Sequence, residues 1–229
     1  MQLFTGQYRS SGKTFVAHLC GTASITETAG GTIDETLAAL VHAAYLQGDF
    51  GDGRQGASPA KRAEVRDALG ADAEVLVAQY TTWRWRSRLA ELLDHGPGTL
   101  EDWECTLAFL RLANEVEEHV DFANDYCPNH APHVFPLADV ARCAEYLGRD
   151  ELGRLAQELA DEVAGHTVPL SLQLTRGASA VVSSRSVRTR LPVRWARDGG
   201  VLRWSAHRVP GARRLVRAMR RWRPTSRSE

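Results

Sequence analysis

The chain has 229 residues, of which 43% are hydrophobic and 24% charged. These proportions are typical of a globular protein and exclude a disordered or fibrous one. No apolar stretch is long enough to cross a bilayer, and the first residues lack the apolar run of a secretion signal. We therefore expect a cytoplasmic protein without a transmembrane segment, whose four cysteines are free thiols.

Apolar residues recur at spacings of three and four through residues 1–166, which predicts an all-α, helical-bundle domain. A glycine-rich loop at 48–56 and a proline-broken loop at 125–136 interrupt this pattern. The expected helices cover residues 14–28, 33–47, 59–69, 71–94, 99–121, 137–147 and 149–165. The side chains expected to face inward on the first two helices are Phe15, Leu19, Thr22, Ile25, Ile33, Leu37, Leu40, Val41 and Ala44.

Residues 167–229 form an arginine-rich C-terminal extension. Its short β-branched runs predict strand and loop, for which a hairpin is one arrangement, and an amphipathic helix is expected over 212–222. Residues 1–166 carry 26 acidic and 13 basic side chains, a net charge of −13, whereas the extension carries 15 basic and 2 acidic ones, a net charge of +13. Such asymmetry favours docking of the basic tail on its own acidic domain, with nucleic acid or an anionic membrane surface as the other options.

Two histidines adjoin inward-facing positions of the first two helices. His18 precedes Leu19 and His42 follows Val41, so neighbouring antiparallel helices would present both imidazoles to one point. A later helix carries Asn114 at the end of a stripe of Trp103, Leu107 and Leu110. His18, His42 and Asn114 are therefore our candidate metal ligands, since imidazole suits divalent transition ions. The other interpretation is that the histidines are hydrogen-bonded core residues.

The sequence around these residues resembles the HD-type metal-dependent phosphohydrolases. His18, the segment Thr36-Leu-Ala-Ala-Leu-Val-His-Ala43, and Leu110-Arg-Leu-Ala-Asn-Glu-Val116 are similar to the motifs of the alarmone (guanosine tetraphosphate) hydrolase domains, as is the connecting segment 62–81. The resemblance covers about residues 8–125 and implies an HD-like helical fold. If the chain is an enzyme, the resemblance also implies metal-dependent hydrolysis.

The HD motif itself is altered. The aspartate that follows the second histidine in the family is Ala43 here, the later aspartate is Asn114, and an acidic pair is replaced by Leu46 and Gln47. An uncharacterised branch of the same group, whose second motif reads approximately His-Ser-x-Tyr-Gly-Thr, is also similar to His42-Ala-Ala-Tyr-Leu-Gln-Gly-Asp-Phe50. Loss of the carboxylates removes hard oxygen ligands, so the usual metal-activated water is not implied.

Substitutes for the missing groups lie nearby in the sequence. Tyr45 follows His42 by one turn and is a candidate weak acid. The candidate catalytic residues are His18, His42, Tyr45, Asp49 and Glu115, and further acidic substitutes are Asp52, Glu117 and Glu118.

The sequence thus predicts an HD-like domain with an altered metal site that binds, and as an enzyme hydrolyses or transforms, a small phosphorylated or polar metabolite. Its cofactor is either a divalent ion (Mn, Fe or Zn) or none. The alternative is a non-catalytic sensor or scaffold whose basic tail contacts nucleic acid, an anionic membrane or a protein partner.

Overall fold

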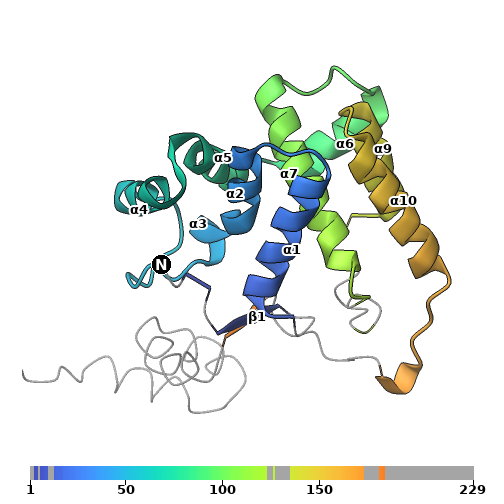
Figure 1. Cartoon of the computed structure of the whole chain (residues 1–229), viewed down its shortest axis with the longest axis horizontal. Helices are drawn as coiled ribbons and strands as arrows, with labels where there is room; N and C mark the ends of the chain where they lie inside the picture. Colours follow the sequence, from blue (N-terminus) through green and yellow to red (C-terminus); the bar gives the residue numbers. More distant parts are fainter. Residues whose placement is uncertain are drawn as a thin grey trace, which may run out of the picture. The chain divides into compact units, whose positions relative to one another are not determined.

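The fold is all-α, as the hydrophobic periodicity predicted (Figure 1). The computed structural model describes residues 3–4, 6–9, 13–122, 126, 135–172 and 181–183. The chain divides into two units, residues 1–182 and 183–229, and nearly all described residues belong to the first. In chain order the elements are β1 (Gln7–Arg9), α1 (Phe15–Thr28), α2 (Ile33–Val41), α3 (Ala44–Gln47), α4 (Pro59–Leu69), α5 (Ala71–Thr82), α6 (Trp85–His95), α7 (Asp102–His119), α9 (Leu137–Tyr146), α10 (Asp150–Ala164), a 3₁₀ turn (Leu170–Leu172) and β2 (Val181–Ser183).

Local capping signals place most helix starts where the sequence predicted them. The Thr14 hydroxyl accepts a hydrogen bond from the Ala17 amide at the start of α1. Thr32 and Glu35 form a reciprocal capping box on α2, and Ser58 caps α4 ahead of a proline in its first turn. These side chains satisfy backbone amides that have no partner within the helix.

Two of the expected helices are each divided in the structure. The expected helix 33–47 ends at Val41 and resumes at Ala44. At this break the His42 imidazole Nδ1 donates to the carbonyl oxygen of Ala39, which also accepts from the His42 backbone amide. The expected helix 71–94 breaks at Trp83, whose extended backbone (ψ 132°) lets its indole donate to Glu104. In both places a tertiary or side-chain contact outweighs helix propensity.

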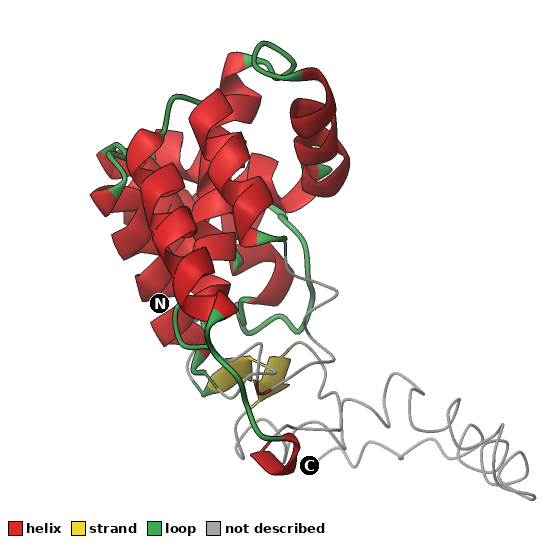
Figure 2. Cartoon of the chain, turned by 90° about the vertical axis from the view of Figure 1, so that its right-hand side faces the viewer, coloured by secondary structure: helices red, strands yellow, loops and turns green. Residues whose placement is uncertain are grey.

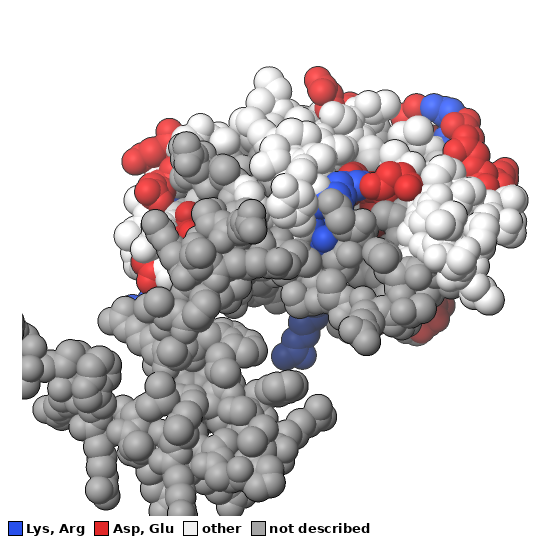
Figure 3. Space-filling model, turned by 90° about the horizontal axis from the view of Figure 1, so that it is seen from below, with Lys and Arg blue, Asp and Glu red and all other residues white. Residues whose placement is uncertain are grey.

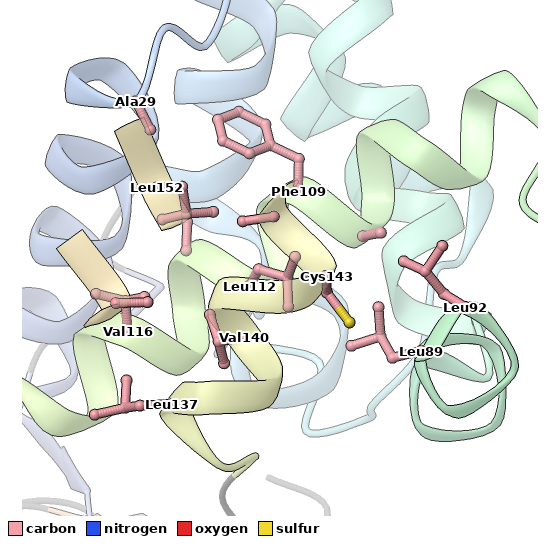
Figure 4. Packing of buried hydrophobic residues seen from close by; sticks show 14 of the residues in the cluster. Ala29, Leu89, Leu92, Phe109, Leu112, Val116, Leu137, Val140, Cys143 and Leu152 are labelled. Carbon is pink, nitrogen blue, oxygen red and sulfur yellow. The ribbon is translucent and has the colours of Figure 1, made fainter. Parts of the chain in front are cut away.

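The long helix α7 is the centre of the fold and contacts α1, α2, α5, α6, α9 and α10 (Figure 1). One face of α7 packs against α6, α9 and α10, and Figure 4 shows Phe109, Leu112 and Val116 among the side chains of this cluster. The opposite face contributes Leu107 and Leu110 to a second cluster shared with α1 to α5. In the view of Figure 2 the helices form one bundle, with the two short strands at one end.

The inner face of α2 differs from the one predicted. Ile33 is 79% exposed, and Leu37, Leu40 and Val41 are only partly buried. Small side chains fill the interior instead, because α2 packs closely against both α1 and α5 and leaves little room for larger groups. The buried alanines of this segment are Ala38, Ala39, Ala43 and Ala44, and the larger side chains of Glu35, His42 and Tyr45 are buried beside them.

The C-terminal extension is mostly outside the described residues. The strand β2 falls in the β-branched run that was expected to start a hairpin, but it pairs with β1. The expected helix over 212–222 lies outside the described part of the chain. Within that described part, no helix has the length and apolar character needed to span a membrane.

Replacing Leu152 by alanine should lower the free energy of unfolding by about 2–5 kcal/mol, because its fully buried side chain joins α10 to the cluster on α7 and its removal leaves a cavity. Urea denaturation measures this change. The matched control is Ile33→Ala, which removes a branched side chain that is 79% exposed and should change stability by less than about 0.5 kcal/mol. Equal losses in the two variants would contradict the burial of Leu152 in this cluster.

Candidate functional site

His18, His42 and Asn114 meet in the interior, where α1, the end of α2 and α7 come together. The Asn114 Nδ2 lies 3.1 Å from His18 Nε2 and 2.8 Å from His42 Nε2. The two imidazole centroids are 5.4 Å apart, with the rings nearly perpendicular. All three side chains are at most 5% exposed. The predicted convergence of these residues is thus present in the structure.

The hydrogen bonds around the two rings define their tautomers. His42 Nδ1 donates to the Ala39 carbonyl at 2.8 Å, which leaves a lone pair on Nε2. His18 Nδ1 contacts the Glu117 carboxylate, while its Nε2 faces the Arg9 guanidinium at 3.5 Å. Because a guanidinium only donates, His18 Nε2 must accept and Nδ1 must carry the proton. Both Nε2 lone pairs therefore point toward the Asn114 amide.

Burial keeps both imidazoles neutral. The pKa of His18 and the pKa of His42 are each lowered to about 3, mainly because the interior disfavours the charged ring. The nearby Arg9 and Arg111 guanidinium groups add to this effect on both rings. Burial raises the pKa of the Glu117 carboxyl above its ordinary value, and the Lys13 ammonium, 2.6 Å from Glu117 Oε1, opposes that rise.

Three glutamates follow Asn114 on α7, and each is buried against a cation. Glu117 pairs with Lys13 as well as with His18. Glu118 pairs with Arg9, and Glu115 pairs with Arg111 one turn earlier on the same helix. Figure 3 views the molecule from below and shows acidic and basic side chains next to one another on that face. In Figure 1 the start of α1 and the end of α7 both lie on this side. The site is thus bordered by cations that already have carboxylate partners.

The structure does not bring the remaining predicted residues to the two histidines. The hydroxyl of the buried Tyr45 donates a hydrogen bond of 2.8 Å to Glu74 on α5. The Tyr45 ring stacks on Phe50. Asp49 is exposed and accepts a hydrogen bond from the backbone of the loop after α3. Asp52 in the same loop pairs with Lys61. Glu115 accepts a hydrogen bond from the Phe135 amide at 2.7 Å, in addition to its bond with Arg111.

Sequence reasoning missed several contacts of the site. The Tyr80 ring packs 5.3 Å from the His42 ring, and its hydroxyl accepts from Arg111 at 3.4 Å. Arg9 and Lys13 also adjoin the site, although they precede the first helix. Opposite charges at residues 9, 13, 117 and 118 are visible in the sequence, but they are too far apart in the chain to be paired without a fold.

The donors present fit a borderline transition ion better than a hard one. Both imidazoles have their Nδ1 groups held by partners, as is usual for metal-ligating histidines. A half turn of the Asn114 amide would add a neutral oxygen. Ala43, next to His42, contributes no donor and Asn114 contributes only a neutral one, so this donor set includes no carboxylate. The described residues contain no cluster of three histidine, cysteine or acidic side chains arranged to bind a metal, so any metal site here depends on the amide.

A family model described as a domain of unknown function (DUF6817) matches residues 2–84. The match includes His18 and His42 and ends before α7, so it covers less than half of the chain. Neither a curated protein nor a solved structure matches the chain.

Acidification should destabilise the protein through His42. Its folded-state pKa lies below the value of 6.5 in the unfolded chain, so between about pH 6.5 and 3 the unfolded state binds a proton that the folded state excludes. This contribution falls by up to about 1.4 kcal/mol per pH unit in that window. His42→Gln should therefore make the pH dependence of the free energy of unfolding less steep, measured with urea between about pH 7 and 5, while His18, whose pKa is lowered in the same way, still contributes. Glu117 acts in the opposite direction but is common to both proteins.

The exposed His95 supplies the control for this comparison. His95→Gln should retain the pH dependence of the original chain. A His42→Gln profile parallel to that of His95→Gln would show that His42 titrates normally in the folded state.

Tyr45→Phe should lower the free energy of unfolding by about 1–2 kcal/mol without moving the imidazole resonances of His18 and His42. The substitution removes only the hydroxyl that donates to the buried Glu74, whose carboxylate still accepts from Arg62 and Arg66. Thermal unfolding and histidine-selective NMR measure the two quantities. Displaced resonances of both histidines would place Tyr45 within the site after all.

Proposed function

We propose that this chain is an altered HD-like domain in which His18, His42 and Asn114 hold one divalent transition ion. Through that ion the domain binds a small phosphorylated or otherwise polar metabolite. If the domain is a hydrolase, it also transforms that metabolite. The observation that carries the proposal is the convergence of two neutral imidazole Nε2 atoms on one buried amide. The resemblance of the surrounding motifs to the HD group adds support. We place this activity in the cytoplasm, with which the free thiols of Cys20, Cys105 and Cys143 are compatible.

The proposal requires each residue to play a defined part. His18 and His42 supply nitrogen ligands, which suit Zn²⁺, Fe²⁺ and other ions of intermediate softness. Glu117 and the Ala39 carbonyl keep the ligand nitrogens unprotonated by holding the Nδ1 protons. A bound ion would supply Lewis acidity toward an anionic or carbonyl oxygen. Arg9, which lies next to His18 Nε2 and pairs with Glu118, would add positive charge near an anionic group of the metabolite.

The charge of the ligand set favours an anionic metabolite. All three donors are neutral, so a divalent ion would retain its full charge in a buried setting, where an uncompensated charge is costly. The HD motif offsets this charge with carboxylates, but Ala43 and Asn114 occupy those positions here. An anion from solution would restore the balance.

A non-catalytic sensor or scaffold is the second candidate function. It is favoured by the Asn114 amide, whose two N–H groups can satisfy both imidazoles without any metal. In that case the three side chains are a hydrogen-bonded core element. The two candidates differ in whether the purified protein takes up a metal ion.

Titration of the metal-free protein with Co²⁺ distinguishes these functions, because protein-bound cobalt absorbs visible light. We expect about one ion per chain, with the affinity reduced at least tenfold in His18→Ala and His42→Ala. Asn114→Asp should tighten binding by about tenfold, since a carboxylate offsets the charge of the ion. Inorganic phosphate should then alter the cobalt spectrum, because it supplies the missing negative charge.

The control is His95→Ala, which removes an exposed histidine at the end of α6 and should leave Co²⁺ affinity unchanged. Absence of Co²⁺ binding, or binding that survives loss of both His18 and His42, would reject the metal site and leave the non-catalytic interpretation.

A further inference from the structure

Gly21 on α1 lies directly against the Glu117 side chain of α7. A Cβ atom built on Gly21 would lie 2.8 Å from both Cγ and Oε1 of Glu117, and 3.2 Å from Cδ. These separations are too short for non-bonded atoms, so any side chain at this position must displace Glu117. Gly21 follows His18 by three residues, which puts both on the same face of α1.

Nothing in the backbone conformation at position 21 calls for glycine. Gly21 lies inside a regular helix and is not among the described glycines with positive φ. Glycine in a helix interior is unfavourable compared with alanine, because more conformational freedom is lost on folding. Helix propensity therefore argues against glycine at position 21. What glycine provides there is the space that the Glu117 side chain occupies.

The Glu117 carboxyl group cannot be displaced without breaking its contacts with His18 and Lys13. Oε2 of Glu117 contacts His18 Nδ1, and Oε1 is 2.6 Å from Lys13 Nζ. The side chain is only 5% exposed and packs across the interface between α1 and α7. A methyl group at position 21 would therefore disturb the hydrogen bond that orients the His18 ring.

We propose that Gly21 is a positioning residue of the site: its missing side chain lets Glu117 cross to α1 and hold His18 with Nε2 directed at Asn114 and His42. This inference takes one element from the proposed function, namely that His18 belongs to the functional site. The contact among Gly21, Glu117 and His18 exists without any metal.

The experiment is a double-mutant cycle on metal-free protein, with substitutions at Gly21 and Glu117. The readouts are the imidazole ¹⁵N shifts of His18, which report its tautomer, and the thermal midpoint. Gly21→Ala should shift the His18 resonances and lower the midpoint, although glycine to alanine in a helix normally stabilises. In a Glu117→Ala background the same substitution should cause no further shift of His18 and no loss of stability, because the collision has been removed.

Gly153→Ala is the matched control. Gly153 lies in α10, and a Cβ there would meet its nearest neighbours at 3.4 Å and 3.7 Å, which is ordinary contact. This variant should keep the original His18 resonances and a thermal midpoint that is unchanged or raised.

The proposal is overturned if Gly21→Ala leaves the His18 resonances in place, or if it has the same effect with and without Glu117. If Gly21→Ala alone does not fold, recovery of a folded protein in the double variant supports the proposal. A double variant that remains unfolded while Glu117→Ala folds contradicts it. Because these readouts need no metal, a failure to bind Co²⁺ would reject the proposed function and leave this result intact.

Discussion

The second half of α7 buries three carboxylates, and the fold depends on their neutralisation. Glu115, Glu117 and Glu118 are each less than 10% exposed, and an unpaired charge in such a place costs several kcal/mol. The partner of Glu115 comes from α7 itself. Lys13 and Arg9, which neutralise the other two, come from the segment before α1. This requirement ties the start of the chain to the central helix.

The same ion pairs shape the candidate site. Glu117 contacts both Lys13 and the His18 imidazole. The same carboxyl group is therefore paired with a cation and orients the His18 ring. Burial keeps both histidines neutral, and their free nitrogens meet at Asn114. The site therefore combines a neutral centre with a surrounding layer of paired charges. The asparagine amide satisfies this centre in the structure, and under the proposed function a cation accompanied by an anion would bind there.

Breaks in the expected helices contribute to this geometry. His42 lies where α2 ends, and its bond to the Ala39 carbonyl both closes that helix and holds the ring. The break at Trp83 leaves Tyr80, at the end of α5, against the His42 ring, while the Trp83 indole bonds to Glu104 on α7. Helix propensity is similar on both sides of each break, so local sequence alone does not place them. The interactions that divide the helices involve groups whose partners are known only after folding.

Local signals in the chain were sufficient to predict the all-α class, most helix boundaries and the approach of His18 to His42 near Asn114. Apolar periodicity and capping residues are local signals, and residues next to a buried stripe must approach the core. Which charged groups surround the site depends instead on how the helices pack. Glu117 reaches His18 across α1 and α7, whereas Tyr45 turns to Glu74 instead. These choices depend on how closely the helices pack and on the space between them, such as the space that Glu117 occupies beside Gly21, and a linear pattern carries no measure of either.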